Sequence, residues 1–253
     1  MDTQRDFESV SSSSPDLATG ENSRRSFLKR SALGSVPALL ALNTFAQAGH
    51  KSKAPKMTGY TGVPSDQAQA EAAKMSSLPS LFPGWNDRNF QEIRNDENTH
   101  VAELLYVLGS SARPKPTFQF LEASTPGQFV ALALAFENTG VGAYLQAGYF
   151  INNRTYGFVA NQIALVEAYH SGYLNTLANS PIVPNANHYA NGLSVVQIVT
   201  AVTPFIVSLN GGPTPGYQDV QSDANDVNIL NFALLLEFLE QEFYNTNVPK
   251  FFG

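Results

Sequence analysis

Residues 93–107, IRNDENTHVAELLYV, combine the pattern of an amphipathic helix with two side chains that bind metals. Steps of three or four residues, which place side chains on one face of a helix, separate Ile93, Glu97, His100, Leu104 and Val107. Glu97 and His100 therefore lie on the apolar face, where a buried carboxylate needs a compensating charge. A single Glu-x-x-His pair is more often a solvated pair or a local hydrogen bond, so its meaning depends on the rest of the chain.

The same spacing recurs at residues 163–177, IALVEAYHSGYLNTL, where Glu167 and His170 occupy the apolar face. Two other predicted helices each place one glutamate on such a face, Glu137 between Val130 and Tyr144 and Glu237 between Leu230 and Tyr244. The predicted ligand set is therefore Glu97, His100, Glu137, Glu167, His170 and Glu237.

Two points within this set stay open. Glu240 and Glu242 lie close to Glu237, and either is an alternative as the ligand or a solvent-facing companion. We prefer Glu237 because it lies seven residues from both Leu230 and Tyr244. Tyr144 and Tyr244 lie two turns from their glutamates, and we expect them to pack in the core rather than to act beside the metals. His50 and His188 are expected to be surface residues.

Four inward carboxylates repel one another and lose their hydration, which makes their burial unfavourable without cations. Two divalent ions would neutralise the four charges, and the two imidazoles would complete the ligand set. Ligands rich in oxygen, with little nitrogen and no sulfur, favour iron or manganese over copper and argue against structural zinc. We therefore expect two iron or manganese ions as the cofactor and metal ions as the partners.

Helical patterns fill the chain from about residue 86, and no strand pattern competes with them. Glycine, proline and asparagine separate the predicted helices, which cover 87–109, 125–148, 156–178, 194–209 and 226–245. Gly109 is a suitable C-terminal stop, Thr125 and Asp226 are candidate N-caps, and Pro204 should kink or break the short fourth segment. The fold class is all-α, an antiparallel four-helix bundle with one additional short helix.

The first 48 residues have the features of an export signal. Ser23-Arg24-Arg25-Ser26-Phe27-Leu28-Lys29 resembles the bacterial twin-arginine signal, an apolar stretch of 31–42 follows, and Ala46-Gln47-Ala48 offers a cleavage site. The alternative is a basic, disordered N-terminus. We expect residues 1–48 to be a signal peptide that leads to the periplasm or the outside of the cell, 49–85 a flexible linker with a helical turn near 68–75, and 86–253 the bundle.

Composition excludes several other functions. Charged residues make up 14% of the chain and its formal net charge is -6, so it lacks the basic patch that nucleic acid requires. It has no cysteine, which excludes disulfides and thiolate metal sites. No segment of the mature chain is expected to span a membrane, and an assembly of identical chains stays open as an alternative to a monomer.

Two Glu helices combined with two Glu-x-x-His helices resemble the ferritin-like carboxylate bundles. DVNILNFALLLEFLEQEFY at 226–244 is similar to the opening helix of secreted bacterial ferritin-like domain proteins, the group that includes desiccation-related proteins. The segments at 93–117, 135–145 and 166–174 resemble their second, third and fourth helices. The resemblance implies a circularly permuted order in which the first helix has moved to the C-terminus. An alternative is a rearranged gene. The permuted order also predicts that residues 251–253 lie near 83–90.

The resemblance leaves two hypotheses on function. The first is an exported dimetal carboxylate protein with oxidoreductase chemistry on Fe(II), oxygen or peroxide. The second is a stress-protective or binding module in which any metal only stabilises the bundle. The sequence does not decide between them, because a fold does not fix a function.

Overall fold

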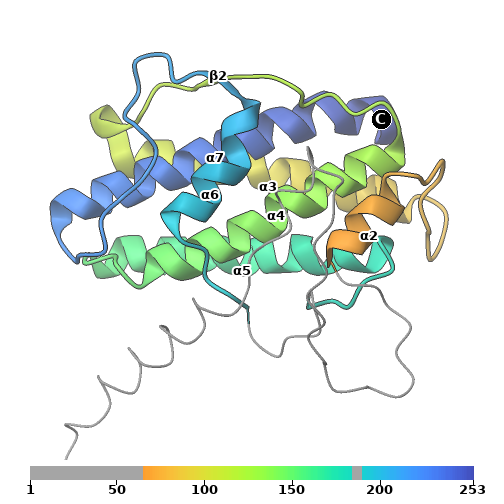
Figure 1. The fold of residues 1–253 in the computed structure, drawn as a ribbon, viewed down its shortest axis with the longest axis horizontal. Helices are drawn as coiled ribbons and strands as arrows, with labels where there is room; N and C mark the ends of the chain where they lie inside the picture. Colours follow the sequence, from red (N-terminus) through yellow and green to blue (C-terminus); the bar gives the residue numbers. More distant parts are fainter. Residues whose placement is uncertain (1–64, 184–189) are drawn as a thin grey trace, which may run out of the picture. The chain divides into compact units, whose positions relative to one another are not determined.

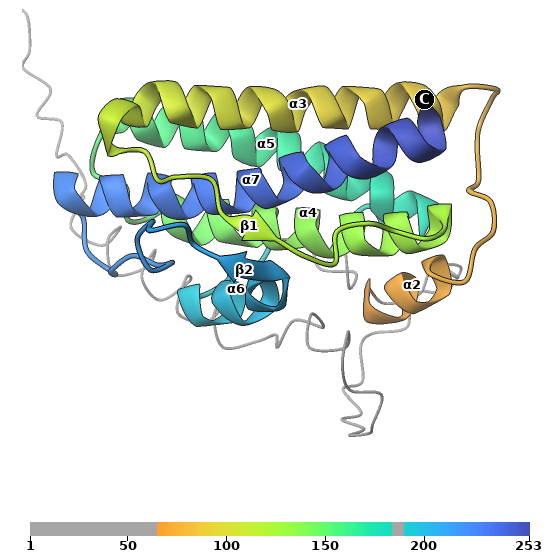
Figure 2. The same cartoon turned by 90° about the horizontal axis from the view of Figure 1, so that it is seen from above.

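Four long antiparallel helices form the bundle (Figures 1 and 2). The computed structural model describes residues 65–183 and 190–253. The bundle consists of α3 (Trp85–Leu108), α4 (Pro126–Gly148), α5 (Arg154–Leu177) and α7 (Asp223–Phe252). The largest helix contacts are between α3 and α7 and between α4 and α5. The predicted all-α bundle is confirmed, and the expected helices 87–109, 125–148 and 156–178 differ from the observed ones by at most two residues at each end.

Short local signals set the ends of these helices. Thr125 accepts a hydrogen bond from the backbone N–H of Gln128, and Pro126 is the first helical residue of α4, as predicted. Gly109 ends α3 with a φ of 53°, which glycine adopts without strain. The 3-10 turn Gly109–Ser111 follows.

Helix α7 differs most from its prediction, since it covers Asp223–Phe252 rather than 226–245. Its N-cap is Ser222, whose side chain accepts from the backbone N–H of Asn225, so the prediction of Asp226 as the N-cap is wrong. At the other end the helix continues through Pro249, because the Phe252 ring stacks on Phe90 of α3 at 4.4 Å. The C-terminus therefore lies against the start of α3, which confirms the expected proximity of 251–253 and 83–90.

The short elements lie outside the four helices. α6 (Val195–Val202) is followed by the 3-10 turn Thr203–Phe205, so Pro204 breaks the segment expected to be helical over 194–209. Strand β2 (Ile206–Ser208) then pairs antiparallel with β1 (Thr117–Phe118). These two strands were not expected, because two or three residues are too short to show an alternating pattern.

One helix lies within the segment expected to be a linker. α2 (Ser65–Ala72) begins three residues before the helical turn expected near 68–75 and packs on α4, with Ala68 and Ala72 fully buried. Gly127 of α4 permits this contact, because a Cβ there would lie 2.2 Å from the Ala72 carbonyl oxygen. Both α2 and α6 contact α4 (Figure 2). Residues 1–64 and His188, and with them the expected export signal and His50, lie outside the described residues.

Candidate metal centre

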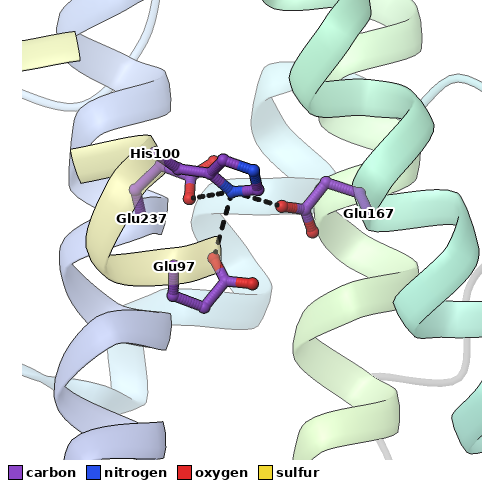
Figure 3. A group of neighbouring side chains, drawn as sticks. All are labelled: Glu97, His100, Glu167 and Glu237. Atoms are coloured by element: carbon purple, nitrogen blue, oxygen red, sulfur yellow. Dashed lines mark ion pairs between the residues drawn. The ribbon is translucent and has the colours of Figure 1, made fainter. Parts of the chain in front are cut away.

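All six side chains predicted as metal ligands meet in the middle of the bundle. The four glutamates are fully buried, and His100 and His170 are 7% and 5% exposed. Their ligand atoms form two groups of four, in each of which all the atoms lie within 4.8 Å of one another. The first group is Glu97, His100, Glu167 and Glu237 (Figure 3), and the second is Glu97, Glu137, Glu167 and His170.

The two groups share Glu97 and Glu167, the glutamates of the two Glu-x-x-His pairs. Each group then has one histidine and one further glutamate of its own. Because a carboxylate has two oxygens, a shared glutamate can present one oxygen to each group. The arrangement has the form of two neighbouring cation positions with two shared carboxylates.

Three carboxylates surround one nitrogen of His100. Its Nδ1 lies 3.4 Å from Glu97 Oε2, 3.3 Å from Glu167 Oε1 and 3.3 Å from Glu237 Oε2 (Figure 3). A single ring N–H points in one direction, so it cannot donate to three oxygens on different helices. In keeping with this, His100 Nδ1 and these oxygens have no hydrogen-bond partner among the described residues. The four atoms face a common point that suits a cation.

The second group repeats this geometry around His170. Its Nδ1 lies 3.1 Å from Glu97 Oε1 and 3.2 Å from Glu137 Oε2. The other ring nitrogen, Nε2, lies 3.0 Å from Asp96 Oδ2. Metal-ligating histidines commonly donate their second ring N–H to such a carboxylate, which fixes the ring. Sequence reasoning missed Asp96, although its position one residue before Glu97 places it at the edge of the same helix face.

Two tyrosines hold the glutamates that are not shared. Tyr144 of α4 donates to Glu237 Oε1 at 2.5 Å, and Tyr244 of α7 donates to Glu137 Oε1 at 2.5 Å. Each bond leaves the Oε2 of its glutamate facing a histidine, and this oxygen has no hydrogen-bond partner within residues 65–183 and 190–253. Both tyrosines are buried in the core, as expected, and each hydroxyl in addition orients a carboxylate of the cluster.

Glu240 is a fifth buried glutamate that the sequence left undecided. The structure confirms Glu237 as the α7 member of the cluster, because it belongs to the first group and contacts His100. Glu240 belongs to neither group, yet it is only 3% exposed and its Oε2 has no hydrogen-bond partner in the described part of the chain. Glu242 instead pairs with Lys115 at 3.1 Å near the surface.

Burial and mutual repulsion perturb the ionisation of the cluster. Burial and the nearby Glu167 raise the pKa of Glu97 to about 7. Burial and the carboxylates of Glu137 and Glu237 raise the pKa of Glu167 well above its usual range. Burial and repulsion from the Glu167 carboxylate also raise the pKa of Glu240 well above its usual range.

The pKa values of the two histidines are also raised, but for a different reason. Burial opposes the charged imidazole of His100, but contacts with Glu167, Glu237 and Glu97 outweigh it and raise the pKa of His100. Burial likewise opposes the charged His170, while Glu137 and Asp96 raise its pKa. Burial also opposes ionisation of Glu237, but His100 lowers the pKa of Glu237 below its usual value. Without cations, therefore, the cluster is held together by protons on the imidazoles and on some of the carboxylates.

The donor set suits iron or manganese. It offers carboxylate oxygens and two imidazole nitrogens, and no hydrogen bond from another described residue reaches their inward atoms. Such a set excludes the sulfur-rich sites of structural zinc and is typical of the metals that carboxylates and imidazoles bind together. The buried, unpartnered oxygens therefore fit cations better than they fit any hydrogen-bond network within the protein.

Comparison with known families agrees with this geometry. The family model described as ferritin-like domain matches residues 43–180, more than half of the chain and all of α2 to α5. The chain therefore belongs to the ferritin-like domain family. No curated protein and no solved structure matches it. Among the described residues, no helix is long and apolar enough to cross a membrane.

Proposed function

We propose that this ferritin-like protein is an exported protein with a dimetal carboxylate centre that reacts with Fe(II), oxygen or peroxide. The observation that carries the proposal is the pair of four-residue groups that share Glu97 and Glu167. Iron or manganese, when bound there, would supply redox chemistry toward small oxidants.

The protein itself contributes position, protons and exclusion of water. Tyr144 and Tyr244 hold the two unshared glutamates with one carboxylate oxygen facing inward, and Asp96 orients His170. Burial of all six side chains keeps bulk water away from the cluster. The pocket beside Tyr144 and the pocket beside Glu240 each have about 10 Å³ of free volume, which is close to the space that one water molecule needs. Such pockets favour small reactants over a large organic substrate.

Metal loading tests this proposal together with its alternative. Mature protein would be loaded anaerobically with Fe(II) or Mn(II), and its metal content, melting temperature and consumption of oxygen and peroxide would be measured. We expect two ions per chain, a higher melting temperature because only the folded state binds them, and consumption of an oxidant. If the ions bind without any such consumption, the protein is the non-catalytic protective or binding module.

Single substitutions sharpen this experiment. Glu167→Gln is nearly isosteric with a protonated glutamate, so we expect it to remove most of the metal-dependent rise in melting temperature while changing the metal-free protein little. His100→Ala should also remove that rise. Glu122→Ala is the matched control, because Glu122 is an exposed glutamate that pairs with Lys250 at 2.7 Å, away from the cluster. If the control loses the rise as well, metal binding does not depend on the cluster.

Two features of organisation complete the proposal. The motif at 23–29 supports twin-arginine export, and replacing Arg24 and Arg25 by lysine should keep the protein inside the cell. The second feature is circular permutation, which is supported by the contact between Phe252 and Phe90, because this contact brings the end of α7 to the start of α3. A chain with α7 joined ahead of α3 and opened within 211–216 should therefore fold and bind the same metals.

A further inference from the structure

Glu240 lies one helical turn after Glu237 on α7, and one oxygen of its carboxyl group has no partner among the described residues. The residue is 3% exposed, and its Oε2 has no hydrogen-bond partner among the described residues. Glu237, by contrast, has a tyrosine donor on one oxygen and His100 beside the other. A buried carboxylate without a donor or a cation is strongly unfavourable, so Glu240 needs a partner that the other described side chains do not supply.

A glycine on the facing helix leaves space beside this carboxylate. A Cβ at Gly140 of α4 would lie 2.8 Å from Glu167 Oε2 and 3.6 Å from Glu240 Oε1. The two oxygens therefore face the same small volume above the Gly140 backbone, which a larger residue would fill. Among the described residues, Glu167 Oε2 also lacks a hydrogen-bond partner, as does Oε2 of Glu240. Two carboxylates that each have an unpartnered oxygen therefore approach each other over Gly140, Glu167 through Oε2 and Glu240 through Oε1.

The surroundings of Glu240 supply no cation. A small pocket beside it is lined by Phe136, Thr139, Gly140, Val202, Leu236, Leu239 and Glu240. None of these lining residues is basic, so the described part of the chain offers no lysine, arginine or histidine in the wall of this pocket. The pocket lies between α4, α6 and α7.

We propose that Glu240 is a fifth carboxylate ligand of the metal centre and that it binds a cation jointly with Glu167 over Gly140. This inference rests on the proposed dimetal function and adds a residue to it. Four carboxylates balance two divalent ions, and a fifth adds one negative charge beside them. Glu240 therefore increases the affinity of the centre for cations on the α6 side.

The test compares Glu240→Gln with Glu242→Gln by Mn(II) titration, followed by calorimetry and by electron paramagnetic resonance. Glu242 is a matched control two residues away on the same helix, where it pairs with Lys115 near the surface. Glu240→Gln should weaken binding of at least one Mn(II) by about tenfold or more, the scale seen when even an outer-shell partner of a metal is removed. It should also change the resonance spectrum, while Glu242→Gln should do neither.

A second variant tests the space instead of the charge. Gly140→Ala places a methyl group between Glu167 and Glu240, so it should also lower the affinity for Mn(II). Melting curves of the metal-free variants would be recorded first, to establish that each variant folds. Two tightly bound Mn(II) ions in Glu240→Gln, at wild-type affinity and with the wild-type spectrum, would overturn this inference and leave the dimetal proposal standing. If the wild type itself binds neither Mn(II) nor Fe(II), the dimetal proposal fails, and this inference fails with it.

Discussion

Helix α7 buries carboxylates in two regions and treats them in opposite ways. Near its start, Asp226 is fully buried and accepts hydrogen bonds from the backbone N–H groups of Asn152 at 2.7 Å and Asn153 at 2.8 Å. Three to four turns later, Glu237 Oε2 and Glu240 Oε2 are equally buried and receive no hydrogen bond from the described residues. The carboxylate of Asp226 is satisfied by backbone N–H groups, whereas the unpartnered oxygens in the middle of α7 are the ones assigned to cations in the proposal above.

Removing the hydrogen-bonded carboxylate of Asp226 should have the largest effect on stability. Asp226→Ala removes two charge-assisted hydrogen bonds and leaves two N–H groups of the α4–α5 turn without an acceptor. We expect the free energy of unfolding to fall by about 3 kcal/mol or more, since each such bond contributes about 1.5–3 kcal/mol. Urea denaturation measures this loss, which should be the same in metal-free and metal-loaded protein. A loss that appears only after metal loading would show that Asp226 belongs to the cluster.

The central cluster should instead make the metal-free protein sensitive to pH. In the folded state the pKa of Glu97 is about 7 against an ordinary 4.5, and the pKa of His100 is also raised. Both groups therefore hold protons in the folded state that the unfolded chain has lost, and stability declines as pH rises from 5 to 8. The slope reaches about 1.4 kcal/mol per pH unit for each such proton. The lowered pKa of Glu237 acts in the opposite sense, but only below its ordinary value of 4.5.

Melting temperatures of the metal-free protein between pH 5 and 8 measure this trend. Glu97→Gln should flatten it, because the glutamine has no proton to lose. Metal ions replace the protons, so the rise in melting temperature on metal loading should grow with pH. A metal-free protein that becomes more stable from pH 5 to 8 would contradict the ionisation described for the cluster.

Substitution of the tyrosines should have the smallest effect on stability. Its effect on metal affinity should still distinguish the central cluster from the rest of the bundle. Tyr144→Phe removes the hydroxyl that donates to Glu237 Oε1, which should cost about 1 kcal/mol of stability. It should also weaken metal binding by about tenfold or more, because the carboxylate loses its orientation. Tyr244→Phe should behave alike. Tyr173→Phe is the control, since Tyr173 donates to Asn86 Oδ1 at 2.8 Å near the start of α3, and it should leave metal affinity unchanged.

The sequence was informative where helix periodicity was unambiguous. In α3 and α5, polar residues alternate with a single apolar stripe, so Glu97, His100, Glu167 and His170 could be placed on the inner face by counting. In α7 the run Ile229–Leu239 is apolar on nearly every face and almost entirely buried. Counting could therefore favour Glu237 but could not show that Glu240 is buried too.

Contacts between segments that are distant in the chain could not be predicted from the sequence. Asp226 has the chemistry of an N-cap, and only the packing of α7 on the α4–α5 turn gives its carboxylate the backbone of Asn152 and Asn153 instead. Pro249 predicts the end of a helix, but stacking of Phe252 on Phe90 extends the helix past it. The crossed bonds of Tyr144 and Tyr244 likewise join α4 and α7, whose relative register no local pattern fixes.

The most direct test of the account is a crystal structure of the metal-loaded protein, with anomalous diffraction data collected at the iron or manganese absorption edge. The account predicts two anomalous peaks about 3.5–4 Å apart. One peak should lie among Glu97, His100, Glu167 and Glu237, and the other among Glu97, Glu137, Glu167 and His170. Protein that has been exposed to both metals and shows no peak in either group would contradict the account, because the buried glutamates would then be held by protons alone.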